Sequence, residues 1–354
     1  MNANAELSVE PRCTLDGATL RANARLWSER CGGRLRAVVK SEGYGWGGER
    51  LIRLLEDEVE GFCVLDPSEA RGLYDATEHP ITLLGACDPS GIAEALAQGA
   101  LPNIATLAEL DVALDYVRTH GSSVTIRAGL APALSWHGLA SDTVRAFAQR
   151  LASEPRIAVE LWTHLTSKEA EAEDLRAFDA FAAHFQAAKA HIASADVAAS
   201  AAAARGVHNA TRALRIGIGL FGAYRRELPR LRCALRLKAR VVSRCDASPS
   251  LRAGYGRCPL PEGRFVETLR LGYGDGWARG LTGATVPLEE GEARIASIGM
   301  QQTVITHDLP PAASRRLLHP LTDLAGLCAS TAITPHELVL GLGARYRARL
   351  LLDS

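Results

Sequence analysis

The sequence lacks an apolar run of the roughly 18 residues that a membrane-spanning helix needs, so no membrane span is expected. It also lacks an excess of either charge, since Lys+Arg and Asp+Glu both number 40 and the formal net charge is zero. A neutral chain has no long-range field that would gather nucleic acid or anionic lipid. We therefore expect neither nucleic acid nor a membrane as a partner.

Paired cysteine motifs are absent as well. The 8 cysteines are scattered along the chain, and no two of them form a C-x-x-C pair. This distribution argues against a zinc site and against a disulfide framework, so we expect no metal. The first residues, MNANAELSVEPR, lack the basic stretch followed by an apolar stretch that an export signal would show. We expect a cytoplasmic protein.

Short apolar segments alternate with alanine-rich helical stretches over the first two-thirds of the chain. The predicted strands are Arg36–Val39, Gly61–Leu65, Ile81–Leu84, Pro102–Ala105, Val124–Ala128, Ile157–Thr163, Val197–Ser200 and Leu214–Ile218. The helical windows between them include Asp66–Tyr74, Ser90–Gln98, Leu107–Thr119, Ser141–Ala152, Ser167–His191 and Ala201–Ala213. This alternation is typical of a βα barrel, although a doubly wound open sheet gives the same pattern. No G-x-G-x-x-G follows the first strand, which disfavours the dinucleotide-binding form of the open sheet.

The pattern changes after about Cys233. Segments such as ALRLKARVVSRC and ARIASIGMQQTVITHDL alternate apolar with polar residues between Gly/Pro turns, as half-buried antiparallel strands do. A short helix over Thr334–Leu340 is expected before a last strand, ARYRARLLL. The predicted fold class is α/β, with a TIM-like (βα)8 barrel over residues 1–232 followed by a mostly-β domain over 233–354.

The most informative segment is AVVKSEGYGWGG. Lys40 closes an apolar strand, directly before a loop that contains Tyr44 and four glycines. In a βα barrel this places the ammonium group at the carboxyl-end face, where active sites are built. Burial disfavours the charged form of a lysine, so an amine nucleophile becomes available. The structural alternative is an ordinary surface lysine at a strand end.

Further polar groups are predicted on the same face. His164 and Ser200 end the sixth and seventh strands, and Arg215 lies in the eighth. Gly217 and Ile218 offer adjacent backbone N–H groups, which together with Ser200 form a nest for phosphate. Taken singly, the histidine would satisfy a local hydrogen bond and the arginine would pair with a carboxylate. Together with the lysine they suit pyridoxal phosphate (PLP), whose aldehyde needs an amine and whose phosphate needs a nest.

The chain resembles the alanine racemases, fold-type III PLP enzymes, from LDGATLRAN near its start to GLGARYRARL near its end. AVVKSEGYGWG is similar to the family's A-V-V-K-A-[ND]-A-Y-G-H-G, which implies that Lys40 bonds the cofactor and Tyr44 contacts it. THLTS is similar to T-H-F-A-S, which puts His164 beside the pyridine ring. LRIGIGLFG is similar to V-R-P-G-I-A-L-Y-G, which makes Arg215 the partner of the pyridine nitrogen. The implied phosphate ligands are Ser200, Gly217 and Ile218.

Three motifs in the β domain extend the resemblance. AGYGR is similar to V-S-Y-G-x and implies that Tyr255 is the second catalytic base beside Lys40. LGYGDGW is similar to I-G-Y-A-D-G-Y, which implies that Tyr273 lines the substrate entrance. ASIGMQQ stands at the position of G-R-V-S-M-D-Q, which implies that the Met300 backbone meets the substrate carboxylate. The resemblance thus implies two-base racemisation of a free amino acid, alanine or another small or polar one. It also implies a homodimer whose subunits share active sites.

The sequence departs from the family pattern at several places. IRAGLAPALSWHGLA is two residues longer than K-V-D-T-G-M-N-R-L-G-F and lacks its Asp-Thr-Gly. Arg127 stands where the family has a lysine that is often carbamylated, and Trp136 or His137 falls at a family arginine, so His137 is the candidate substrate contact. The other replaced motif residues are now Trp46, Ala199 and Gln301. Because Lys40 and Tyr255 survive, we expect an altered substrate pocket in a working enzyme.

Two alternatives stay open at this point. A different PLP enzyme on the same barrel, catalysing elimination or decarboxylation, would use the same Lys40. A non-catalytic PLP-binding homologue is the other alternative, but such barrels usually stop before a second domain, and this chain continues over 233–354.

Overall fold

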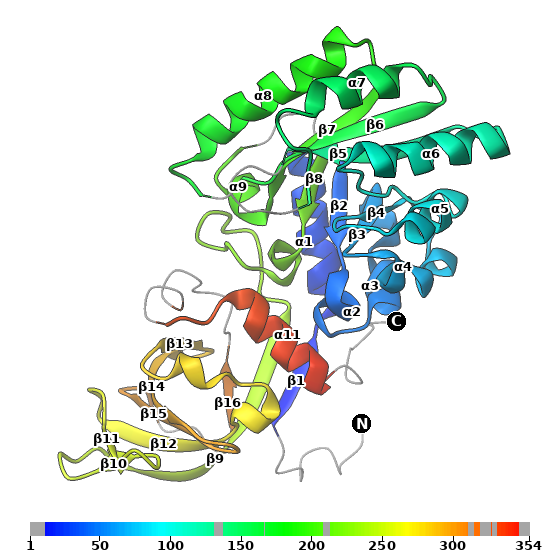
Figure 1. Cartoon of the computed structure of the whole chain (residues 1–354). Helices are drawn as coiled ribbons and strands as arrows, with labels where there is room; N and C mark the ends of the chain where they lie inside the picture. Colours follow the sequence, from blue (N-terminus) through cyan, green and yellow to red (C-terminus); the bar gives the residue numbers. More distant parts are fainter. Residues whose placement is uncertain are drawn as a thin grey trace. The chain divides into compact units, whose positions relative to one another are not determined.

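The computed structural model describes residues 11–130, 137–165, 167–207, 213–310, 315–318, 327 and 331–346. Internal contacts divide the chain into two compact units, which we call the barrel unit and the β unit (Figure 1). The barrel unit comprises Ala24–Gly43 and Gly48–Gly217. The β unit comprises Met1–Asn23, Tyr44–Gly47 and Ile218–Ser354. The boundary between residues 232 and 233 stays a prediction.

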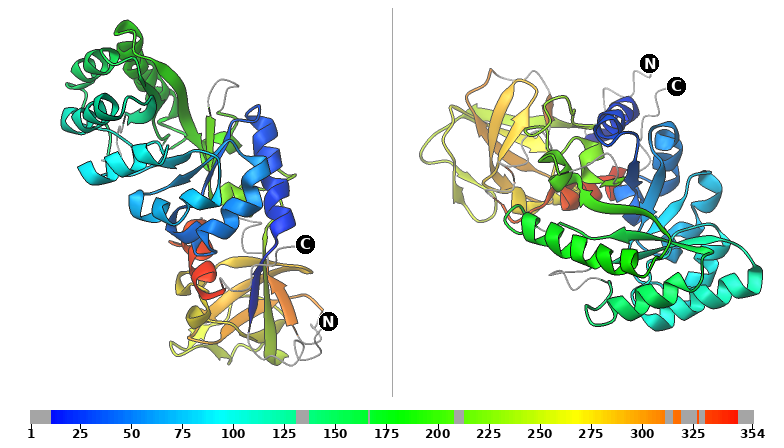
Figure 2. Two further views of the ribbon diagram at one scale, coloured as in Figure 1. Left: turned by 90° about the vertical axis from the view of Figure 1, so that its right-hand side faces the viewer. Right: turned by 90° about the horizontal axis from the view of Figure 1, so that it is seen from above.

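Seven parallel strands form the sheet of the barrel unit, in the order β4-β3-β2-β8-β7-β6-β5. They are β2 (Leu35–Val38), β3 (Gly61–Val64), β4 (Ile81–Leu83), β5 (Val124–Gly129), β6 (Ile157–Trp162), β7 (Ile192–Ala199) and β8 (Ala213–Ile216). Strands β2, β3 and β6 are buried at every residue, because helices cover the outside of a parallel sheet (Figure 2).

The ring closes through a segment that is not a regular strand. The predicted strand over Pro102–Ala105 is wrong, since only isolated parallel bridges form there. Thr82 of β4 pairs with Leu101, and Asn103 pairs with Arg127 of β5. A proline has no N–H to donate to a strand ladder, which explains the interruption. Because the bridges join the two edge strands, the sheet is a barrel and not an open sheet.

The helices of the barrel unit differ in how they begin, and only some of them start at a side-chain cap. Their bounds are α1 (Gly17–Arg30, which starts in the β unit), α3 (Gly48–Leu55), α4 (Pro67–Arg71), α5 (Pro89–Ala97), α6 (Leu107–His120), α7 (Val144–Ala152), α8 (Glu171–Ala187) and α9 (Ser200–Ala204). Asp66, Asp88 and Thr106 cap α4, α5 and α6 through side-chain oxygens that accept backbone N–H groups. The predicted window Ser167–His191 is longer than α8, and the window Ala201–Ala213, whose residues 208–212 lie outside the described part of the chain, extends past the end of α9 at Ala204.

An antiparallel sheet forms most of the β unit, in the order β1-β9-β12-β15-β14-β13-β16. Its strands are β1 (Arg12–Leu15), β9 (Leu235–Asp246), β12 (Phe265–Arg270), β13 (Thr285–Leu288), β14 (Gly291–Ile298), β15 (Thr303–His307) and β16 (Arg315–Leu318). Strand β16 also pairs with β9, which closes a ring. A small hairpin joins β10 (Arg252–Ala253) to β11 (Cys258–Pro259). The expected fold class, a TIM-like barrel followed by a mostly-β domain, is confirmed.

One element of the β unit differs from the prediction. Helix α11 (Pro335–Tyr346) begins at the expected position, where the Thr334 hydroxyl accepts the Glu337 N–H at 3.3 Å. It then continues through Ala344–Tyr346, the described part of the predicted last strand, because Leu338, Leu342 and Tyr346 recur on one buried face. No helix in the described part of the chain is both long and apolar enough to cross a membrane.

Candidate active site

Lys40 begins a tight turn two residues beyond the end of β2. This turn, α2 (Lys40–Tyr44), is left-handed: Ser41, Glu42, Gly43 and Tyr44 have φ of 55°, 55°, 60° and 56°. The Gly43 N–H closes it by donating to the Val39 carbonyl at 2.8 Å. A left-handed residue other than glycine costs about 1–2 kcal/mol, so neighbouring groups have to hold this turn in place.

Glu69 ties the turn to the rest of the barrel. Its carboxylate accepts the Ser41 N–H at 2.7 Å and the Leu65 N–H at 2.8 Å. The Asp66 cap places Glu69 in the first turn of α4. The backbone that follows Lys40 is therefore anchored to the end of β3, a connection that the sequence pattern does not reveal.

The other predicted groups of the barrel unit come from the ends of neighbouring strands. His164 follows β6, Ser200 follows β7, Arg215 lies in β8, and Gly217 follows β8. Strands β2, β8, β7 and β6 are consecutive in the sheet and all parallel, so these residues share its carboxyl end with Lys40. The Gly217 N–H donates to the Ser200 hydroxyl at 3.3 Å. The structure thus brings together an amine, an imidazole, a guanidinium and a hydroxyl.

His164 is held in its neutral form. Burial, together with the positive charges of Arg215 and Lys40, lowers the pKa of His164 to about 3 from an ordinary value of 6.5. An imidazole with this pKa carries no charge at neutral pH, so it can accept a hydrogen bond at one ring nitrogen.

Arg215 is buried and is fixed at two of its three nitrogens. Its Nη2 donates to the Thr163 carbonyl at 2.6 Å, and its Nε lies 2.5 Å from Asp196 Oδ1. The second contact is an ion pair whose N–H does not point squarely at the oxygen. The guanidinium also lies 5.8 Å from the centre of the Trp162 ring. Nη1 is the nitrogen that neither polar contact uses.

Arg127 does not lie alone at its strand position but belongs to a buried ion network. Its Nε donates to Glu160 at 2.7 Å and its Nη2 to Asp196 at 2.5 Å, and none of these three side chains is more than 1% exposed. Glu160 is also paired with Arg36 at 2.5 Å. The sequence motifs do not single out Asp196, Glu160 or Arg36; the one signal for them is a charged residue within an otherwise apolar strand.

His137 contacts an acidic group within the barrel unit. Its Nε2 lies 3.1 Å from Glu109 Oε2, and its carbonyl accepts the Asn103 amide at 2.9 Å. Burial alone would raise the pKa of Glu109, but hydrogen bonds from His137 and from the Ala105 N–H outweigh burial and lower it. Contact of His137 with a substrate stays a prediction, and Trp136 lies outside the described residues.

Tyr44, Trp46 and Ile218 belong to the β unit. Tyr44 is buried and packs edge-on against Phe221 with ring centres 5.4 Å apart. Ile218 begins the buried 3₁₀ turn η4 (Ile218–Phe221). Trp46, at the position of the motif histidine, is fully buried. The ring of Tyr44 also lies 6.1 Å from that of His336, and its cofactor contact stays a prediction.

Three predicted residues of the β unit are exposed. Tyr255 lies in the turn between β10 and β11 and is fully exposed to solvent (101%). Tyr273 and Met300 are held next to each other, because the Tyr273 N–H donates to the Gly299 carbonyl at 3.0 Å and the Gly274 N–H donates to the Met300 carbonyl at 2.8 Å. Large side chains left in solvent are candidates for contact with another molecule.

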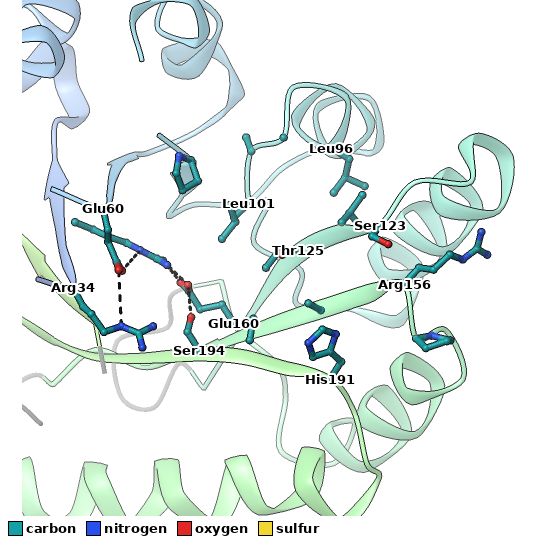
Figure 3. A pocket seen from close by; sticks show the side chains of 18 residues that line it. Arg34, Glu60, Leu96, Leu101, Ser123, Thr125, Arg156, Glu160, His191 and Ser194 are labelled. Atoms are coloured by element: carbon teal, nitrogen blue, oxygen red, sulfur yellow. Dashed lines mark hydrogen bonds and ion pairs between the residues drawn. The ribbon is translucent and has the colours of Figure 1, made fainter. Parts of the chain in front are cut away.

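A cavity of about 630 Å³ lies at the opposite, amino-terminal ends of the barrel strands (Figure 3). Its polar side chains largely face one another: Glu160 accepts from Ser194 at 2.8 Å, and Glu60 lies 3.4 Å from Arg36. Reactive groups of βα barrels come from the carboxyl ends of the strands, whereas the amino-terminal end contributes to stability. We therefore assign the chemistry to the strand ends that carry Lys40.

Comparison with known proteins identifies the family. The family model for the alanine racemase N-terminal domain matches residues 15–225. The chain belongs to the alanine racemase family. It is 28% identical to an alanine racemase of Methylobacterium sp. (strain 4-46), over 94% of this chain and 96% of that protein. It is 27% identical to an alanine racemase of Azoarcus sp. (strain BH72), over 83% and 84%.

Solved structures of the family share the fold. Biosynthetic alanine racemase from Pseudomonas aeruginosa matches with a TM-score of 0.77 and 23% identity, over 95% of this chain and 97% of that one. Alanine racemase from Bartonella henselae, solved with covalently bound pyridoxal phosphate, matches with a TM-score of 0.75 and 21% identity, over 96% and 99%. The expected family and the expected enzyme type, a racemase of the isomerase class, are confirmed.

Proposed function

We propose that this racemase uses PLP to invert the α-carbon of a free amino acid, with Lys40 and Tyr255 as its two bases. The observation that carries the proposal is the grouping of Lys40, His164, Ser200 and Arg215 at the carboxyl ends of four consecutive parallel strands. This grouping supplies one amine and a set of fixed polar donors on one face of the barrel.

The residues of the barrel unit fit the cofactor by the chemistry of their donor groups. Lys40 offers an amine to the aldehyde, and the Ser200 hydroxyl and the Gly217 N–H, already 3.3 Å apart, offer donors to the phosphate. The Ile218 N–H would add a third donor. Nη1 of Arg215 would meet the pyridine nitrogen. When bound, PLP withdraws electrons from the α-carbon of the substrate and makes its hydrogen removable.

Arg215 and His164 set the charge around the ring. Arg215, which is paired with Asp196, would donate a hydrogen bond to the pyridine nitrogen and would disfavour a proton there. His164 is neutral because of its lowered pKa, which avoids a further positive charge at this place. Arg215 would therefore keep a proton off the pyridine nitrogen of the bound cofactor, and His164 would add no charge beside it.

Lys40 and Tyr255 would act from opposite faces of the substrate. One removes the α-hydrogen, and the other returns a proton from the far side, so the centre is inverted. A tyrosine with the ordinary pKa of about 10 is a poor base at neutral pH. We propose that neutral His164, polarised by Arg215, accepts a hydrogen bond from the phenol and so assists proton removal.

We further propose that Tyr255 acts in the active site of a partner subunit, in a homodimer. The support is its complete exposure at a hairpin turn, with Tyr273 and Met300 also exposed at 42% and 58%. Mixing Lys40→Ala and Tyr255→Phe proteins tests this, because heterodimers would carry one intact site and regain part of the activity. An active monomer in sedimentation would refute the dimer.

The substrate is proposed as alanine, the amino acid in the names of the relatives, or another small or polar amino acid. The departures in residues 127–140 and at Gln301 fall where the resemblance places the substrate carboxylate, so specificity is where a difference is expected. Incubation with PLP and single L-amino acids in D2O, followed by analysis of α-deuterium and chirality, identifies the substrate.

One experiment tests the cofactor assignment directly. Borohydride reduction of the PLP-loaded protein should fix the cofactor to the peptide that contains Lys40, and Lys40→Ala should abolish the labelling. Lys238→Ala, at an exposed position of β9, is the matched control and should label as the wild type does. Labelling at another lysine, or none in the wild type, would refute the assignment.

A further inference from the structure

A row of buried charges crosses the interior of the barrel unit. Its members, linked one to the next by ion pairs, are Arg36, Glu160, Arg127, Asp196 and Arg215. Burial alone would raise the pKa of Glu160, but the positive charges of Arg127 and Arg36 outweigh it and lower the pKa. We call this set the charge row; it contains three cations and two anions.

Asp196 is the member of the charge row that is paired with Arg215, the arginine of the proposed cofactor site. It is fully buried, its Oδ2 accepts from Arg127 at 2.5 Å, and its Oδ1 lies 2.5 Å from Arg215 Nε. The backbone N–H of Thr163 donates to the Asp196 carbonyl at 3.1 Å, and the Thr163 carbonyl accepts from Arg215. Arg127 and the strand backbone therefore hold Asp196 independently of Arg215.

We infer that Asp196 is a positioning residue that sets the direction of the Arg215 guanidinium. The inference rests on the proposed function, in which Nη1 of Arg215 meets the pyridine nitrogen. An arginine side chain has several rotatable bonds, and the Thr163 carbonyl alone holds a single nitrogen of the guanidinium. Asp196 adds an ion pair to Nε at 2.5 Å, so contacts from two neighbouring strands restrict how the guanidinium can turn, and Nη1 lies outside both contacts.

A purely structural role for Asp196 would be to balance the charge of the row. Both roles predict that Asp196→Asn unfolds more easily, because it leaves three buried cations and one anion. Stability therefore cannot separate the two roles, but a second substitution can. Arg127→Met leaves the Asp196–Arg215 pair intact, and the double variant restores the native excess of one positive charge while leaving Arg215 without its carboxylate.

Other titratable groups that face the charge row come from several elements. They are Lys40 after β2, Glu60 before β3, Cys63 in β3 and His164 after β6. Burial raises the pKa of the Cys63 thiol to about 11, so it stays uncharged in the pH range of the test.

The test uses the PLP-loaded protein with nitrogen-15 at the pyridine position. Four proteins are compared between pH 6 and 9: the wild type, Asp196→Asn, Arg127→Met, and the double variant. The pyridine nitrogen shift reports whether that nitrogen accepts the guanidinium hydrogen bond. It should be the same and independent of pH in the wild type and Arg127→Met. In both proteins that lack Asp196 it should move, and the PLP dissociation constant should rise at least about tenfold.

The outcomes separate the possible failures. If the double variant regains the wild-type shift and affinity, Asp196 only balances charge and the inference is overturned. If all four proteins carry PLP on Lys40 with the same shift, the proposed function stands and the inference falls. If the wild type takes no PLP on Lys40, the proposed function fails and the inference fails with it. Should Asp196→Asn not fold, the charge-balanced double variant still decides between the two roles.

Discussion

The lowered pKa of His164 predicts a specific loss of stability in acid. A proton binds the unfolded chain with the ordinary histidine pKa of 6.5, but binds folded His164 only near pH 3. Because the folded-state pKa is the lower one, this contribution is fully present above pH 6.5 and is lost as the pH falls. The PLP-free protein should thus unfold more easily in acid, because His164 takes up a proton when the chain unfolds. The substitution His164→Gln removes this contribution.

The size of this effect follows from the two pKa values. Relative to pH 7.5, His164 should cost about 1.4 kcal/mol of unfolding free energy at pH 5.5 and about 2.7 kcal/mol at pH 4.5. At pH 4.5 the calculated change in unfolding free energy depends almost entirely on the histidine pKa in the unfolded chain, because the imidazole of the folded protein is still mostly uncharged. Other groups titrate in both proteins, and the difference between wild type and His164→Gln cancels them.

The assay is urea unfolding of PLP-free protein at pH 7.5, 5.5 and 4.5, followed by tryptophan fluorescence. The difference in unfolding free energy should shift in favour of His164→Gln by about 2.7 kcal/mol over this range. The control is His120→Gln, at the exposed end of a helix. Its pH-dependent change in unfolding free energy is compared with that of His164→Gln. In NMR spectra, the imidazole signals that the substitution removes should not move with pH above about pH 4.5. A free-energy difference that stays constant with pH would refute the reasoning.

Three further predictions concern packing, backbone strain and catalysis. A Cβ at Gly129 would lie 2.0 Å from the Trp162 ring, so Gly129→Ala should reduce the unfolding free energy by about 1–3 kcal/mol. The urea midpoint should fall and tryptophan fluorescence should change, and an unchanged midpoint would contradict the packing. Ser41→Gly should relieve the left-handed turn and stabilise by about 0.5–1 kcal/mol, whereas Ser41→Ala should not. Tyr255→Phe should slow racemisation in both directions by roughly 10²–10⁴-fold while solvent exchange at the α-carbon of the D-enantiomer persists. Exchange of both enantiomers at wild-type rates would exclude Tyr255 as the second base and turn attention to Tyr273.

The fold is predictable from the sequence where burial is uniform. Strands such as Gly61–Val64 and Ile157–Trp162 are apolar on both faces, and their predicted bounds agree with the structure to within one residue. The errors fall where local pattern and tertiary context disagree. Pro102 interrupts a ladder that its neighbours would otherwise form. The segment Ala344–Tyr346 alternates as a strand would, but it continues α11, where Tyr346 extends the buried face and Ala344 is exposed.

The candidate site divides in the same way. Lys40 and its neighbours at the strand ends follow from barrel geometry, because parallel strands bring their carboxyl ends to one face wherever they lie in the chain. The groups that hold them do not follow from any local pattern. Glu69 reaches Ser41 over 28 residues, and Asp196 reaches Arg127 over 69. Contacts at such separations are visible only once the register of the sheet is known.

Arg127 shows why a single replaced residue is a poor guide to a changed site. In the sequence alone, Arg127 stands where the family pattern has a lysine, and this suggests a local change near the substrate. In the folded barrel its guanidinium has two carboxylates, Glu160 and Asp196, and lies over the Trp162 ring at 5.4 Å. A cation so enclosed is stable only with its anions, since a buried charge without a partner is strongly destabilising. The replacement is therefore one part of a compensated set that extends to Arg215, and its effect on the chemistry should be sought in how that arginine is held.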